Sequence, residues 1–223
     1  MVVDYGLYVI TCRGLKGGRG HLEVAEAALA GGAAALQLRD KELPGRELLQ
    51  LALRMRALIS ERRPGTLLIV NDRVDVAAAA GADGVHLGQE DLPVKEARRI
   101  LGPRALIGLS VTDLEEARRA RGESVDYLGV GPIFPTPSKD DAAPPMGLEG
   151  LAAVRRETSL PLVAVGGITE DNARAVLRAG ADGIAVISAV CGAPDMAEAA
   201  RRLAALVEGG RRPPAPSRSK EGE

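Results

Sequence analysis

The sequence is poor in aromatic residues and in cysteine. Only 2% of its 223 residues are aromatic, with no Trp and one Phe. Single-stranded nucleic acids are commonly bound by stacking bases on aromatic side chains, so a surface of that kind is not expected. The two cysteines, Cys12 and Cys191, form no CxxC pair, which argues against a disulfide framework and against a structural zinc site. We expect each of them to be a small core residue.

The sequence also lacks an excess of either charge and lacks long apolar runs. Its 29 basic and 30 acidic residues give a formal net charge of −1, so the basic footprint of a nucleic-acid-binding protein is missing. No apolar run approaches the roughly 18 residues of a membrane span, and Met1–Tyr5 does not begin a signal peptide. We therefore expect a cytoplasmic protein that binds small molecules, neither nucleic acid nor membrane. Self-association into a homo-oligomer is left open.

What the sequence does have is a regular alternation of short apolar runs and longer amphipathic stretches. Continuous apolar strands alternating with helices are typical of a parallel sheet that is buried on both faces. Eight such units in a chain of this length predict an α/β fold of the (β/α)8 TIM-barrel type, as a single domain over residues 1–207. The expected strands are Leu7–Thr11, Ala35–Arg39, Leu67–Asn71, Gly84–Leu87, Ala105–Ser110, Tyr127–Gly131, Leu162–Gly166 and Gly183–Ser188. The expected helices are His21–Ala30, Arg46–Arg62, Val74–Ala80, Val94–Leu101, Thr112–Arg121, Leu148–Arg156, Glu170–Ala179 and Asp195–Val207.

The last segment, Glu208–Glu223, differs in composition from the rest of the chain. It consists almost entirely of Gly, Pro, Ala, Ser and charged residues. Such a segment cannot bury enough apolar surface to offset the entropy lost on ordering, so we expect a disordered tail.

Polar residues at the end of the second expected strand indicate an anion site. Active sites of barrels lie at the carboxyl ends of the strands. Gln37 and Arg39 alternate with apolar residues and so point to the same side of the strand, and Lys41 follows them. Two cations and an amide at the mouth of a barrel suit a phosphate or diphosphate. The alternative is a surface strand end with solvated charges.

Two carboxylates follow the third and fourth expected strands. Asp72 comes directly after Asn71, and Asp91 lies shortly after the strand that ends at Leu87. Neighbouring carboxylates repel each other unless a cation lies between them, and Mg2+ is commonly bound by one or two carboxylates together with water and substrate phosphate. The alternative is that each Asp merely caps the helix that follows it.

Further candidates lie after the sixth, seventh and eighth strands. The connection after the sixth strand is long, and long loops in compact domains are commonly functional. It carries Thr136, Ser138 and Lys139, which could grip a phosphate and belong to a closing loop. Gly166-Gly167 after the seventh strand and Ile187-Ser188 at the end of the eighth stand where barrels often bind phosphate through backbone N–H groups. The role of His86, in the fourth strand, stays open between substrate contact and a packed, hydrogen-bonded position.

Several motifs occur together and in order, and they carry a family resemblance. They are Gln37-x-Arg39-x-Lys41, Asn71-Asp72-Arg73, Gly84-Val-His-Leu-Gly-Gln-x-Asp91, Gly108-Leu-Ser110, Tyr127-x-Gly-Val-Gly-Pro-Ile-Phe-Pro-Thr136-x-Ser138-Lys139 and Gly166-Gly-Ile-x-x-x-Asn172. From about Tyr5 to Val207 the sequence resembles the thiamine phosphate synthase family.

The resemblance implies a transferase that joins hydroxymethylpyrimidine diphosphate to hydroxyethylthiazole phosphate and releases pyrophosphate, with Mg2+ as cofactor. It implies a dissociative displacement in which the enzyme mainly binds and neutralises the leaving pyrophosphate. By motif, the residues that bind the pyrimidine diphosphate would be Gln37, Arg39, Lys41 and Asn71, and those that bind Mg2+ would be Asp72 and Asp91. Ser110 and Lys139 would contact the pyrophosphate, so that the catalytic set is Arg39, Lys41, Ser110 and Lys139. Around the thiazole phosphate would lie Thr136, Ser138, Gly167, Val186, Ile187 and Ser188.

Three other functions compete with this interpretation. The thiazole tautomerases resemble the synthases in fold but depend on a His shortly after the position of Ser110, where this sequence has Thr112. Barrels of the indole-glycerol-phosphate synthase group generally show catalytic Lys and Glu at strand ends, an arrangement not evident here. A barrel that only binds thiazole phosphate or thiamine phosphate would have no clear need of paired metal carboxylates.

Overall fold

The computed structural model of the chain describes residues 3–13, 18–136 and 143–210. Of the predicted site residues, Ser138 and Lys139 lie outside these ranges. So does the expected tail from residue 211 onward.

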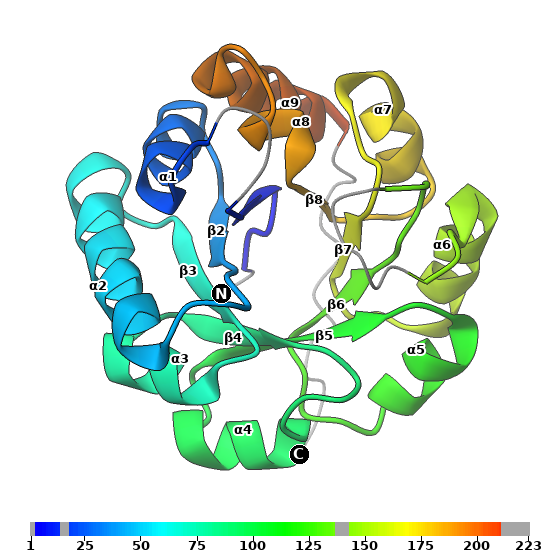
Figure 1. The fold of residues 1–223 in the computed structure, drawn as a ribbon. Coiled ribbons are helices and arrows are strands. Elements are labelled where there is room, and N and C mark those ends of the chain that lie inside the picture. Colours follow the sequence, from blue (N-terminus) through cyan, green and yellow to red (C-terminus); the bar gives the residue numbers. More distant parts are fainter. Residues whose placement is uncertain (1–2, 14–17, 137–142, 211–223) are drawn as a thin grey trace, which may run out of the picture.

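Eight parallel strands form a closed barrel in chain order, with helices around it (Figure 1). Each strand pairs with its neighbours along the chain, and β8 pairs with β1 to close the ring. The strands are β1 (Leu7–Thr11), β2 (Ala35–Leu38), β3 (Leu67–Asn71), β4 (Gly84–Leu87), β5 (Leu106–Val111), β6 (Tyr127–Val130), β7 (Leu162–Val165) and β8 (Gly183–Val186). The predicted (β/α)8 fold is confirmed.

The strands owe their continuous apolar sequences to burial on both faces. Every residue of β1, β2, β6 and β8 is buried, because one side faces the lumen and the other faces the helices. Close approach of two strands also explains why β4 begins with glycine: a Cβ on Gly84 would lie 2.0 Å from the carbonyl oxygen of Leu106 in β5. Cys191 is buried in this core as expected, whereas Cys12 is only half-buried against it.

The helices cover the outside of the barrel (Figure 1). They are α1 (His21–Ala30), α2 (Gly45–Arg62), α3 (Val74–Ala80), α4 (Val94–Leu101), α5 (Leu114–Ala120), α6 (Gly147–Glu157), α7 (Glu170–Arg178), α8 (Ser188–Cys191) and α9 (Met196–Gly210). None of the helices in the described part of the chain is long and apolar enough to cross a membrane.

Three boundaries differ from the sequence-based prediction by two or more residues, for identifiable reasons. The eighth strand ends at Val186 rather than at Ser188, because Ser188 opens the short helix α8, which was not predicted. The fifth helix begins at Leu114 rather than at Thr112, because the Asp113 carboxylate accepts a hydrogen bond from the Glu116 N–H and caps it. The helix α9 continues to Gly210, so Glu208–Gly210 are helical and not part of a disordered tail.

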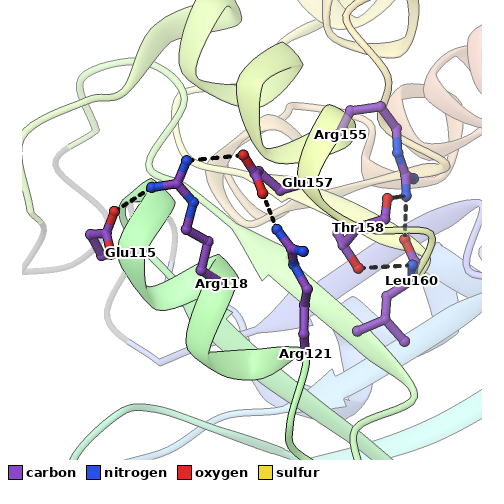
Figure 2. A network of polar contacts seen from close by, with 7 residues as sticks. All are labelled: Glu115, Arg118, Arg121, Arg155, Glu157, Thr158 and Leu160. Atoms are coloured by element: carbon purple, nitrogen blue, oxygen red, sulfur yellow. Dashed lines mark hydrogen bonds and ion pairs between the residues drawn. The ribbon is translucent and has the colours of Figure 1, made fainter.

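A network of ion pairs joins α5 to the end of α6 on the outside of the barrel (Figure 2). The Glu157 carboxylate accepts hydrogen bonds from both Arg118 and Arg121, and Arg118 also pairs with Glu115. Because α6 leads into the start of β7, this network lies at the opposite end of the barrel from the carboxyl ends of the strands. Such exposed pairs contribute about 0–1 kcal/mol each, so the network is a minor term in stability.

Candidate active site

A cavity of about 570 Å³ opens at the carboxyl ends of the strands. It lies where the strand-end residues predicted a site, although these residues come from segments far apart in the sequence. The predicted site residues that line it are Arg39, Lys41, Asn71, Asp72, Asp91, Ser110, Thr136, Gly167, Val186, Ile187 and Ser188. Gln37 does not reach this cavity. It lines a much smaller one, of about 20 Å³, which shares several wall residues with the first and lies deeper in the barrel.

The cationic side of the cavity is formed by Arg39 and Lys41, which follow the last residue of β2. Asp40, which lies between them in the sequence, does not line the cavity, and its carboxylate is held by four neighbouring groups. Its carboxylate lies 3.0 Å from His21 Nε2 and 3.1 Å from Arg13 Nε, and it accepts the backbone N–H groups of Glu42 and Leu43. This anchor fixes the backbone on both sides of Asp40, so it positions the two cations at the mouth.

The anchor changes the pKa of Asp40. Burial of the carboxyl group would raise the pKa, but the hydrogen bonds from His21 and the two backbone N–H groups, with the charge of Arg13, outweigh burial and lower it. A carboxyl whose pKa is lower in the folded state stabilises the fold above its unfolded-state pKa of about 4. That stabilisation is lost as the pH falls through the folded-state value.

We expect Asp40→Asn to lower the stability of the protein at neutral pH by about 2–3 kcal/mol, since it leaves His21, Arg13 and the two backbone N–H groups without a charged acceptor. Thermal unfolding of both proteins between neutral pH and pH about 3 measures the effect. The difference in Tm should shrink as the pH falls below about 4. A difference that stays constant over this range would contradict the anchoring role.

Four carboxylates of the described residues line the cavity, and they include the predicted pair Asp72 and Asp91 beside Glu90 and Glu116. Asp72 has a left-handed backbone (φ 59°), and its N–H donates to the carbonyl oxygen of His86, 2.9 Å away. The Asp91 carboxylate accepts the N–H of Gly88 at 2.6 Å. Neither side chain caps a helix: α3 and α4 have Arg73 and Pro93 at their N-caps, and neither helix has a side-chain cap. The capping interpretation of these two residues is therefore wrong.

The surroundings of Asp72 change the pKa of its carboxyl group. Burial, a hydrogen bond with Asp91 and the negative charge of Asp91 raise the pKa of Asp72 to about 6, while the charges of Lys41 and Arg39 act in the opposite direction. Two mutually repelling carboxyl oxygens suit a hard divalent cation such as Mg2+, which usually takes one or two carboxylates and completes its coordination with water and phosphate. No cluster of three or more His, Cys, Asp or Glu that could hold a metal occurs in the described residues, so this pair is incomplete without oxygen ligands from water or substrate.

The sequence left open whether His86 contacts a substrate or is packed and hydrogen-bonded. In the structure it is hydrogen-bonded and also lines the cavity. Its Nε2 lies 2.9 Å from Ser110 Oγ and its Nδ1 lies 3.0 Å from the hydroxyl of Tyr127. The rings fit only because their neighbours are glycines: a Cβ on Gly108 would lie 2.1 Å from Tyr127 Cζ, and one on Gly129 2.6 Å from His86 Cε1. These glycines and Tyr127 were not among the predicted site residues.

The loop after β6 is held against the turn after β7. The N–H groups of Ile133 and Phe134 donate to the carbonyl oxygens of Val165 and Gly166, 2.9 and 3.1 Å away. Gly167 has φ 63°, and a Cβ there would lie 2.7 Å from Phe134 Cβ. The Asn172 side chain donates to the Gly167 carbonyl oxygen at 2.9 Å, which fixes the orientation of that peptide. Thr136 lies at the end of the described part of this loop.

We expect Gly167→Ala to raise about tenfold or more the KM for the thiazole phosphate that the family resemblance implies, because the turn must shift to relieve the contact and the left-handed strain of about 1–2 kcal/mol. Steady-state kinetics with each substrate varied in turn measure this effect. Gly65→Ala is a matched control, since Gly65 has φ 99° but no neighbour within 4 Å of a Cβ. Equal effects of the two substitutions on KM would contradict the assignment.

Some residues that line the cavity were missed because nothing in their type marks them. They are small or apolar residues of strand ends, such as Gly129, Gly131, Val165 and Ala185. Only their alternate positions along the strands would have placed them on the lumen side.

Known proteins of one family match this chain over nearly its whole length. The family model for thiamine monophosphate synthase matches residues 7–190. A thiamine-phosphate synthase of Chloroflexus aurantiacus is 55% identical over 206 residues, which cover 92% of this chain and 94% of that protein. One of Moorella thermoacetica is 54% identical over 204 residues, covering 92% of this chain and 96% of the other.

The fold is shared with solved structures. A thiamine phosphate pyrophosphorylase from Pyrococcus furiosus superposes with a TM-score of 0.85 at 47% identity, covering 93% of this chain and 98% of that chain. A 3-hexulose-6-phosphate synthase, at 20% identity and a TM-score of 0.64, shares the fold alone. The family model and the identity to its members agree that this chain belongs to the thiamine monophosphate synthase family.

Proposed function

We propose that this protein joins hydroxymethylpyrimidine diphosphate to hydroxyethylthiazole phosphate in the cavity at the carboxyl ends of its strands, with Mg2+ bound at Asp72 and Asp91. As a member of its family, at about 50% identity to thiamine-phosphate synthases over most of its length, the protein is a transferase that makes thiamine phosphate. The metal and the roles of individual residues are the parts proposed here.

One observation carries the proposal: the cations Arg39 and Lys41 face the same cavity as the neighbouring carboxylates Asp72 and Asp91, and Glu90 and Glu116 also line it. The pKa of Asp72 responds to the charges of Arg39, Lys41 and Asp91 together, so the four groups are close enough to interact. A diphosphate bound to the two cations would place its oxygens beside the carboxylates, where a divalent ion completes the charge balance. A site for a single neutral ligand would not need this arrangement.

The reaction breaks the bond between the pyrimidine methylene carbon and the diphosphate oxygen, and the electron pair leaves with pyrophosphate. The thiazole nitrogen then forms the new bond to that carbon. Arg39 and Lys41 would bind the departing oxygens, and Ser110 would donate a hydrogen bond to them. Bound Mg2+ would supply additional neutralisation of the charge that develops on the pyrophosphate. Lys139 and Ser138, outside the described residues, keep their roles as predictions from the motif.

The second substrate would be held at the other side of the cavity. Gly167, Val186, Ile187 and Ser188 line it there, and Thr136 lies on the loop that the Gly166-Gly167 turn holds in place. Binding both substrates in one cavity converts the bond-forming step into an effectively intramolecular one. Gln37 and Asn71 would contact the pyrimidine end of the first substrate, Gln37 from the deeper cavity.

The tautomerase alternative depends on a His that shortly follows Ser110 in the sequence. Thr112 occupies that position, and its hydroxyl and backbone N–H both donate to Glu116, at 2.9 and 2.6 Å. A threonine hydroxyl does not exchange protons near neutral pH as an imidazole does.

The direct test incubates the purified protein with both substrates and Mg2+ and measures thiamine phosphate and pyrophosphate. We expect equal amounts of the two products, and none when EDTA removes the metal. Thiazole carboxylate phosphate in place of the pair tests for tautomerase activity in the same preparation. Product formation that is unaffected by EDTA would exclude the metal proposal, and turnover of the single thiazole substrate would favour the tautomerase.

The proposal has three further parts. The protein is located in the cytoplasm, its partners are small molecules, and it self-associates into a homo-oligomer. Both substrates carry phosphate groups that do not cross membranes freely, which supports the cytoplasm. Cell fractionation and light scattering of the purified protein test the location and the oligomeric state.

A further inference from the structure

Five polar side chains form a continuous line of hydrogen bonds below the cavity, which we call the floor network. It consists of Gln37, Tyr8, Tyr127, His86 and Ser110, one each from β2, β1, β6, β4 and β5. The successive distances are 2.9 Å from Gln37 Nε2 to Tyr8 Oη, 3.0 Å to Tyr127 Oη, 3.0 Å to His86 Nδ1 and 2.9 Å from His86 Nε2 to Ser110 Oγ. The network therefore crosses the barrel and ends at a residue that lines the cavity.

The amide nitrogen at one end gives the network a direction. Gln37 Nε2 can only donate, so the Tyr8 hydroxyl accepts from it. Tyr8 has one hydrogen to donate, and among the described residues its only other hydroxyl partner is Tyr127. The Tyr127 hydroxyl, having accepted from Tyr8, donates to His86 Nδ1. Each step thus follows from the number of hydrogens that a hydroxyl carries.

Burial keeps this direction intact. Tyr8 is 2% exposed and Tyr127 is 1% exposed. Burial is the main cause that raises the pKa of each phenol well above its usual value, so both hydroxyls keep the hydrogen that they donate. A buried donor without an acceptor is energetically unfavourable, which opposes any reversal that leaves one unpaired.

The hydrogen bond between Tyr127 and His86 determines how the Ser110 hydroxyl at the cavity is oriented. Because His86 Nδ1 accepts a hydrogen bond, the hydrogen of a neutral imidazole lies on Nε2 and is donated to Ser110 Oγ. The Ser110 hydroxyl therefore receives a hydrogen bond from below, and its own hydrogen is available on the cavity side. A hydroxyl oriented before the substrate binds stabilises developing negative charge without reorganisation at the moment of reaction.

We infer that Gln37, Tyr8, Tyr127 and His86 are positioning residues that orient the Ser110 hydroxyl as a hydrogen-bond donor to an anionic diphosphate oxygen, with the Nε2 hydrogen of His86 donated to Ser110. The inference rests on the proposed function for the identity of the anion. It assigns His86 a role other than general base, since its Nδ1 is occupied by Tyr127 and its Nε2 already carries a proton.

The direction of the network can be measured without turnover. The protein has two histidines, so the side-chain 15N resonances of labelled histidine can be assigned with a single His86→Gln variant. At neutral pH we expect His86 to carry its hydrogen on Nε2 alone, and Tyr127→Phe to shift it toward the Nδ1 tautomer. Tyr5→Phe is the matched control: its ring centroid lies 4.5 Å from that of Tyr127, but its hydroxyl is not part of the network. A His86 that carries a hydrogen on Nδ1 in the unmodified protein would overturn the inference.

The coupling to Ser110 is measured by calorimetry with inorganic pyrophosphate and Mg2+. We expect Ser110→Ala to weaken binding about tenfold or more, as for a lost hydrogen bond to a charged group, and Tyr127→Phe to weaken it by a smaller factor. The double variant should bind no more weakly than Ser110→Ala, because Tyr127 acts only through Ser110. Additive effects, or no effect of Tyr127→Phe, would overturn the positioning role.

These results are separable from the test of the proposed function. If the unmodified protein forms no thiamine phosphate, the proposed function fails, while the histidine spectrum and the pyrophosphate titration still decide the direction of the network. If thiamine phosphate forms but the spectrum shows the other tautomer, only the present inference fails.

Discussion

Asp72→Asn is expected to lower kcat by about 100-fold to 1000-fold, the range found when one group that stabilises transition-state charge is removed. The amide cannot replace the negative charge that attracts a divalent cation, and it leaves Asp91 as the only carboxylate of the pair. Asparagine is the appropriate replacement because it tolerates the left-handed backbone (φ 59°) that Asp72 adopts, whereas alanine would add strain of about 1–2 kcal/mol. The measurement is kcat as a function of Mg2+ concentration.

A matched control separates loss of charge at the cavity from loss of charge in general. Asp75 lies three positions further along the chain, is exposed, and pairs with Arg73 at 2.6 Å. Asp75→Asn should leave kcat within a factor of about two, since surface substitutions usually change stability by no more than about 0.5 kcal/mol. The apparent stability of Asp72→Asn without metal should equal or exceed that of the unmodified protein, because repulsion with Asp91 is relieved. Unchanged turnover of Asp72→Asn at limiting Mg2+ would exclude Asp72 as a metal ligand.

Arg39→Gln is expected to lower kcat/KM for the pyrimidine diphosphate by about 100-fold to 1000-fold, with a much smaller change in KM for the thiazole phosphate. A guanidinium offers a planar pair of N–H donors and a fixed charge to the departing oxygens, and a neutral amide offers neither. Because charge accumulates on these oxygens as the bond breaks, most of the loss should be in kcat rather than in KM.

The control for this prediction is Arg99→Gln on α4, where the side chain is exposed and pairs only with Glu96 of the same helix in the described structure. It should leave both kinetic constants unchanged. An Arg39→Gln protein with a raised KM for the diphosphate and an unchanged kcat would show that Arg39 stabilises the bound substrate and the transition state equally. Arg39→Lys should recover part of the rate, since it restores the charge without the planar geometry.

The architecture was predictable from the sequence because the signals for it are local. Apolar runs such as Leu67–Asn71 and Gly84–Leu87 coincide with β3 and β4, since burial on both faces requires continuous hydrophobicity. The boundary at Ser188 was not predictable in this way. The residues around α8 are apolar and small, and a four-residue helix has no periodicity that distinguishes it from the end of a strand.

The candidate site was partly predictable for a related reason. In a barrel the carboxyl ends of all strands meet at one opening, so Arg39, Lys41 and Asp72 could be placed around one cavity from their positions after strands alone. Whether Asp72 and Asp91 cap helices or face each other could not be decided, because both outcomes require an Asp just before a helix. Only the observed N-caps, Arg73 and Pro93, separate the two.

By itself the sequence determined the fold class, the ring of polar strand ends and the absence of a large excess of charge, because each depends on residue type and spacing along the chain. Only the tertiary structure decided the partners of His86, the buried position of Gln37 and the hydrogen bond between Tyr8 and Tyr127, which are separated by 119 positions. A side-chain hydrogen bond across the closed barrel forms only if its two atoms are placed to within a few tenths of an ångström of the ideal separation. No local pattern encodes such a distance, since it is set by how all eight strands pack together.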